Sequence, residues 1–128
     1  MTKSRTHRLG DLQLKIMKVL WERRDATVAE VHAALAPDEN LAYTTIATML
    51  RKMEDRDLVA HRLEGRTFVY RPRVEAHAVT RGMSDHLLDR LFNGSLSDMV
   101  AHLLTTREIS REELVKVERL IAERKRKP

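Results

Sequence analysis

The chain has 128 residues, enough for one compact domain or for a small domain with an appendage. Its net charge of +5 and its pI of about 9.9 favour an anionic partner. It has no cysteine, which excludes disulfides, thiolate metal sites and a cysteine nucleophile, and it shows neither a membrane span nor a signal peptide. We therefore expect a cytoplasmic protein without membrane insertion.

The charge is spread unevenly between the two halves of the chain. Residues 1–73 carry 14 Lys and Arg against 10 Asp and Glu, whereas residues 74–128 carry 10 against 9 and owe four of those cations to the terminal run at 124–127. This asymmetry places the anion-binding part in the first half. It predicts an anion-binding domain over residues 1–73 and a second domain, with a different task, over residues 74–128.

The first half begins with two predicted helices. Apolar residues at helical spacing indicate the first, which ends near residues 23–25: Leu9, Leu12, Ile16, Val19 and Leu20. Thr27, followed three residues later by Glu30, forms a capping box that opens a short second helix. Residues 37–40, with the sequence Pro-Asp-Glu-Asn, are typical of a turn.

A third predicted helix, over residues 42–56, has two faces of opposite chemistry. At about 100° per residue, its apolar side chains fall on one side: Ile46, Met49, Leu50 and Met53. The remaining surface carries the candidate DNA-binding residues Tyr43, Thr44, Thr45, Thr48, Arg51 and Lys52. Threonine donates to phosphates or bases at close approach, and arginine binds phosphates or guanine edges. The alternative is an ordinary amphipathic helix with a solvated polar face.

After this helix the pattern changes to that of strands. Residues 58–63 and 67–70 are rich in Val, Leu, Phe and Tyr, the segment 64–66 between them is a hairpin turn, and Pro72 ends the second strand. Arg62 and Arg66 lie near the tip, where we expect contacts with DNA phosphates; the alternative is that both are merely solvated. Three helices followed by a basic hairpin predict a winged helix-turn-helix, whose third helix enters the major groove beside the wing.

The second half predicts three more helices, so the fold class is mainly α. Asn93-Gly94-Ser95 separates the first two, and Ser110 with Glu113 forms a capping box that opens the last. Three short amphipathic helices bury their apolar stripes inefficiently against one another, and we expect them to dimerise with a second copy. The expected dimer interface comprises Leu87, Leu91, Leu96, Val100, Leu103, Val117 and Leu120. The alternative is an intramolecular three-helix bundle.

Signatures of catalysis are missing from the sequence. The six histidines form neither HxxxH nor HExxH, and the four glycines form no phosphate-binding loop. We therefore expect no enzyme activity, no catalytic residue, no metal site and no cofactor.

Several segments together resemble a known family. These are Leu9–Leu12 with Val19-Leu20-Trp21, Thr27–Val31, Leu41–Leu50, Leu58-Val59 with Arg66–Tyr70, Phe92–Ser95 and Ile109–Leu114. They are similar to the BlaI/MecI/CopY family of bacterial transcriptional repressors, the penicillinase-repressor-like proteins. The resemblance covers nearly the whole chain, and the Tyr-Thr-Thr helix is its most specific part.

The resemblance implies a homodimeric repressor that occupies a palindromic operator on double-stranded DNA and blocks transcription. In β-lactam-responsive members, a membrane-bound sensor protease triggers cleavage at an Asn-Phe bond within the dimerisation domain, directly or through a protease acting downstream. The corresponding positions here are His102 and Leu103, so the Asn-Phe pair is not retained. Copper-responsive members bind metal through cysteines near the C-terminus, a mode that this cysteine-free chain excludes.

Two functions of other classes remain open. One is a small-ligand-responsive winged-helix regulator with a pocket between its domains, and the other is a helical protein–protein adaptor whose basic face is incidental. We favour the operator-binding repressor, released from DNA when its C-terminal dimer domain is disrupted. The trigger is either proteolysis near His102 or a non-proteolytic signal.

Overall fold

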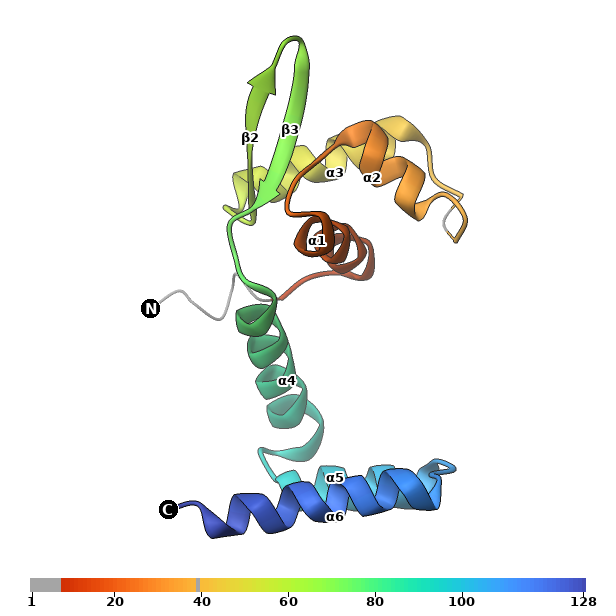
Figure 1. Ribbon diagram of the computed structural model, residues 1–128, viewed down its shortest axis with the longest axis vertical. Coiled ribbons are helices and arrows are strands. Elements are labelled where there is room, and N and C mark those ends of the chain that lie inside the picture. The colour runs from red at the N-terminus through yellow and green to blue at the C-terminus, as the bar shows by residue number, and fades with distance from the viewer. Residues whose placement is uncertain (1–7, 39) are drawn as a thin grey trace. The chain divides into compact units, whose positions relative to one another are not determined.

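The computed structural model describes residues 8–38 and 40–128, so that Glu39 of the expected turn lies outside the described residues. Within this part the chain forms six helices and three strands (Figure 1). It divides into two compact units, Met1–His86 and Leu87–Pro128. The predicted fold class is confirmed, because three helices and a β-hairpin precede three further helices.

Unit 1 is built around three helices: α1 (Asp11–Arg23), α2 (Val28–Leu35) and α3 (Tyr43–Asp55). Each contributes fully buried side chains to one core, among them Ile16, Leu20, Val31 and Leu50. The predicted capping box at the start of α2 is present, because Thr27 Oγ1 accepts from the Glu30 amide at 3.1 Å and the Thr27 amide donates to Glu30 Oε1 at 2.9 Å. Helix α2 therefore begins where the sequence predicts.

The wing is the antiparallel hairpin of β2 (Val59–Glu64) and β3 (Thr67–Pro72), which extends beyond the helices of unit 1 (Figure 1). Glu64 pairs with Thr67, so the turn is shorter than the expected segment 64–66. Gly65 has φ +65°, a backbone conformation that glycine adopts without strain. A third strand, β1 (Ala26–Thr27), pairs with β3 opposite Tyr70 and Val69, and the sequence did not predict it.

The first turns of α4 (Ala76–Phe92) belong to unit 1. Val79 is 1% exposed within the core, and Met83 packs against the same cluster. Just before α4, the carbonyl of Val74 accepts a hydrogen bond from the Trp21 indole of α1. Unit 1 thus extends past residue 73, where the charge pattern placed the end of the first domain.

Unit 2 consists of the end of α4 together with α5 (Leu96–Thr106) and α6 (Arg111–Arg126). Asn93 and Gly94, both with positive φ, end α4, and the amide of Gly94 bonds the Leu88 carbonyl. Ser95 and Ser110 cap the next two helices by accepting from the amides of Asp98 and Glu113. Among the described residues of this unit, no side chain is buried.

Candidate nucleic-acid interface

Helix α3 presents a polar face because its apolar residues fix its rotation in the core. Ile46, Leu50 and Met53 are completely buried, as the helical period predicts. The candidate DNA-binding side chains of the helix are all exposed: Tyr43, Thr44, Thr45, Thr48, Arg51 and Lys52. The fold therefore leaves this row of hydroxyls and cations accessible to a ligand.

The N-terminus of α3 is held by a neighbouring helix rather than by a cap of its own. Ala42, the residue at the N-cap position, supplies no side-chain hydrogen bond. Instead the His32 ring on α2 donates from Nε2 to the Leu41 carbonyl at 2.8 Å and lies edge-on to the Tyr43 ring. His32 thereby sets where the polar face of α3 begins, a contact that sequence reasoning missed because it joins two helices across a turn.

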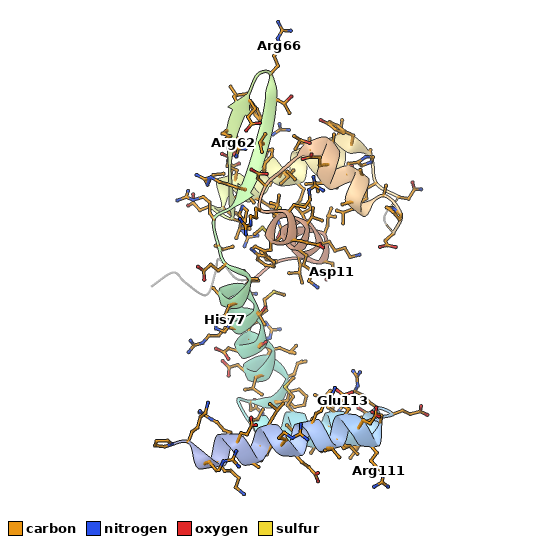
Figure 2. The ribbon with its side chains drawn as sticks, in the orientation of Figure 1. Asp11, Arg62, Arg66, His77, Arg111 and Glu113 are labelled. Carbon is orange, nitrogen blue, oxygen red and sulfur yellow. The ribbon has the colours of Figure 1, made fainter. Side chains whose placement is uncertain are left out.

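The two candidate arginines of the wing occupy different positions. Figure 2 shows Arg66 at the tip of the hairpin, with its side chain directed outward, and Arg62 farther back on β2. Arg62 pairs with Glu64 at 2.6 Å and with Asp25 at 3.0 Å. The hydrogen bonds that Arg62 donates to Glu64, and secondarily to Asp25, raise the pKa of Arg62 above its usual value. Arg62 thus already has two anionic partners, whereas Arg66 projects into solvent.

A histidine connects the wing to the C-terminal half of α3. His61 Nδ1 donates to both carboxylate oxygens of Glu54, at 2.8 and 2.9 Å. Its ring stacks on Phe68 of β3 with 4.1 Å between the ring centroids, and Phe68 is itself 43% exposed. Because side chains alternate along a strand, His61 faces α3 and Arg62 faces the opposite side of the hairpin.

Between α3 and the wing lies a groove of about 420 Å³. Tyr43 and Arg51 of α3 line it together with Arg66 and Tyr70 of the hairpin, next to the first residues of α2. Burial, and secondarily the charge of Glu54, raise the pKa of Tyr70, so its phenol stays neutral at physiological pH. The sequence contained Tyr70 only as a strand residue, and no local pattern marked it as part of this groove.

In unit 2 the candidate interface residues remain largely uncovered. Leu91, Leu96 and Leu120 are each more than 60% exposed, and Leu87 and Leu103 are exposed as well. Val100, Leu103 and Val117 border an apolar groove of about 280 Å³ between α5 and α6. The candidate cleavage residues His102 and Leu103 lie inside α5, where the His102 carbonyl accepts from the hydroxyls of Thr105 and Thr106.

Metal-binding clusters are not found in the described ranges, 8–38 and 40–128, where no three His, Cys, Asp or Glu side chains come together. His7, one of the six histidines considered above, lies outside these ranges. No helix in the described part of the chain is both long and apolar enough to cross a bilayer.

Comparison with known proteins extends the resemblance found in the sequence. Residues 9–123 match the family described as penicillinase repressor. The penicillinase repressor of Bacillus licheniformis is 31% identical over 117 residues, which are 91% of each chain. The transcriptional regulator BlaI of Mycobacterium tuberculosis is 34% identical over 99 residues, covering 76% of this chain and 72% of the relative.

A solved structure agrees with the winged-helix part of the fold. The solution structure of the DNA-binding domain of the repressor BlaI superimposes with a TM-score of 0.52 at 30% identity. The alignment covers 57% of this chain and 89% of that domain.

Proposed function

The chain belongs to the penicillinase repressor family, and from that premise we propose that it is a homodimer that binds a palindromic operator through α3. Members of this family are transcriptional repressors rather than enzymes.

The exposed polar face of α3, held in place by the buried side chains of Ile46, Leu50 and Met53, is the observation that carries the proposal. A helix rigidly packed on one side presents short hydroxyls and two cations at fixed positions on the other. Thr44, Thr45 and Thr48 allow the helix to lie close to base edges, and Arg51 and Lys52 supply charge for phosphates or guanine. Arg66 would contact the backbone from the wing, and Arg62 would have to exchange its carboxylates for phosphate.

Dimerisation is supported by the lack of any buried side chain among the described residues of unit 2. The proposed interface remains Leu87, Leu91, Leu96, Val100, Leu103, Val117 and Leu120. The five leucines of this set are exposed in one chain, and each would contribute roughly 1.5–3 kcal/mol if a second copy buried it; the half-buried Val100 and Val117 would contribute less. Two linked winged helices then meet two half-sites of one operator at high effective concentration.

Release would follow from loss of this second-half interface. Cutting α5 between His102 and Leu103 would separate the candidate interface residues of α6 from those of α4. The cut bond lies within a helix, so a protease would have to bind a locally unwound segment. A signal that weakens the interface without cutting the chain would have the same effect on DNA binding.

The test begins with selection of bound sites from random double-stranded DNA. We expect a selected sequence with two-fold symmetry, and sedimentation of a dimer at micromolar protein concentration. Titration of the selected duplex over salt should show sequence preference and a steep salt dependence. Binding to all sequences alike would contradict the operator proposal, and a monomer in sedimentation would contradict the dimer.

A further inference from the structure

The groove between α3 and the wing contains a tyrosine that is buried and yet lacks a hydrogen bond. Tyr70 is 4% exposed, with its ring packed near His61 at a centroid separation of 5.7 Å. Its hydroxyl makes no hydrogen bond within the described part of the chain. Every fully buried side-chain nitrogen or oxygen atom in that part has a hydrogen-bond partner, so the Tyr70 hydroxyl is not fully buried. The hydroxyl must therefore reach the solvent, and Tyr70 lines only the groove between α3 and the wing among the cavities described above.

The groups around this hydroxyl favour an anion. Arg51 and Tyr43 lie near enough to act electrostatically on Tyr70, and both line the same groove. Glu54 is the acidic group close by, and both of its oxygens accept from His61. The groove therefore offers a ligand two cations, Arg51 and Arg66, and two phenolic donors, while the carboxylate of Glu54 already accepts from His61.

The position of the groove narrows the choice of anion. It lies between the exposed face of α3 and the hairpin, with Arg66 at its outer end, so a duplex whose major groove receives α3 would bring its backbone here. A phosphodiester offers oxygens that accept from tyrosine hydroxyls as well as from arginine, and such contacts set the register of a protein on DNA.

We propose that the Tyr70 hydroxyl, together with Arg51, binds one operator phosphate in each half-site, in the groove between α3 and the wing. This inference rests on the proposed function and adds a specific ligand contact to it. Tyr70 is suited to this task because packing already fixes its ring, so little side-chain entropy is lost when the phosphate binds. The contact would hold the wing and α3 on the sugar-phosphate backbone of the same DNA strand.

The first test compares Tyr70→Phe with the parent protein on the selected duplex. Each half-site loses a hydrogen bond to a charged group, which corresponds to about 10- to 100-fold, so we expect binding to the two-fold symmetric duplex to weaken by about 100- to 10,000-fold. The slope of log affinity against log salt should not change, since the hydroxyl is neutral, whereas Arg51→Ala should lower that slope by about one for each half-site, or about two in all. The unfolding midpoint of Tyr70→Phe should equal that of the parent, because the hydroxyl bonds nothing within the described chain.

The second test identifies the phosphate. Each phosphate of a half-site is replaced in turn by an uncharged methylphosphonate, and parent and Tyr70→Phe are titrated against every duplex. At one position, the parent should lose more affinity than Tyr70→Phe, because both proteins lose the charge contact with Arg51 there but only the parent also loses the contact with Tyr70. If the parent and Tyr70→Phe lost the same affinity at every substituted phosphate, the inference would be overturned. A Tyr70→Phe protein that binds the unmodified duplex like the parent would overturn it as well.

The outcomes of these tests distinguish failure of the Tyr70 phosphate contact from failure of the operator proposal. Sequence-selective binding by α3 that is indifferent to Tyr70→Phe would overturn only the phosphate contact. A parent protein that selects no DNA sequence would overturn the operator proposal and the phosphate contact together.

Discussion

Trp21 of α1 donates its indole N–H to the carbonyl oxygen of Val74, at 2.9 Å. The bond ties the segment after the wing to the first helix, and Val79 follows it into the core. A chain ending at Pro72 loses both contacts. We expect it to be less stable than a chain ending at His86, by about 1.5–3 kcal/mol for Val79 burial and about 0.5–1.5 kcal/mol for the hydrogen bond.

Denaturant unfolding of the two truncated chains measures this difference. Both should be monomeric in sedimentation and should bind a full operator poorly, because their half-sites are no longer linked. Equal stability of the two chains would mean that the start of α4 does not belong to the first unit.

Opposite faces of α3 should respond differently to truncation of a side chain. Leu50 is completely buried, and Leu50→Ala should cost about 2–5 kcal/mol of folding free energy. Arg51 is exposed, and Arg51→Ala should leave thermal stability nearly unchanged while weakening operator binding, by about 1–3 kcal/mol if it reads a base. Calorimetry and DNA titration separate the two effects. An Arg51→Ala protein with parental affinity would argue against this face as the DNA-binding surface.

The two wing arginines should contribute unequally to DNA affinity. Arg66→Ala should weaken binding to all sequences alike and lower the salt slope by about one for each half-site. Arg62→Ala should have the smaller effect, because Glu64 and Asp25 compete with phosphate for its guanidinium. The matched variant Glu64→Gln should strengthen binding, since it removes the closer competitor. If Arg62→Ala weakened binding as much as Arg66→Ala, its ion pairs would have no role in DNA binding.

The phenol of Tyr70 should ionise only above its usual pH range. The chain has two tyrosines, so Tyr43→Phe leaves Tyr70 as the single phenol to follow by ultraviolet absorbance. Burial raises the pKa of Tyr70 above the 10.0 of a free phenol, so the neutral form is favoured in the folded chain. Its contribution to stability is fully present below about pH 10 and is lost as the pH rises through the raised pKa. A Tyr70 phenol that titrates at or below pH 10.0 would contradict this effect of burial.

The length of the repressor chain after induction should distinguish proteolysis from a non-proteolytic signal. Cutting near His102 divides α5 and predicts two fragments whose junction lies within residues 96–106. Mass spectrometry of the repressor from induced cells of its source organism detects them. A full-length chain alongside complete derepression would eliminate the proteolytic route and leave a ligand or a partner protein as the trigger.

Much of the architecture could be predicted because local patterns carry it. The apolar period of residues 46–53 fixed the rotation of α3, and the Thr27–Glu30 pair marked the start of α2. Contacts between distant segments could not be predicted in this way. Strand β1 has two residues, too few to show alternation, and the bond from Arg62 to Asp25 spans 37 positions and depends on that strand.

The groove beside the wing illustrates the same limit. Alternation along β3 indicates which residues share a face with Tyr70, but it does not show which helix covers that face. The end of the first domain is a similar case, because Pro72 marks the end of a strand while Val79 belongs to the core by its packing alone.

Thr27 pairs with Val69 in the sheet and caps α2 with its side chain, so one residue ends a strand and starts a helix. An insertion or deletion between Asp25 and Val28 would therefore break either the sheet register or the cap. The hairpin turn at Gly65 does not join two elements in this way. Residues added there cost only loop-closure entropy, which grows slowly with loop length. Among relatives of this chain, length variation should accumulate at the wing tip and be absent at the junction before α2.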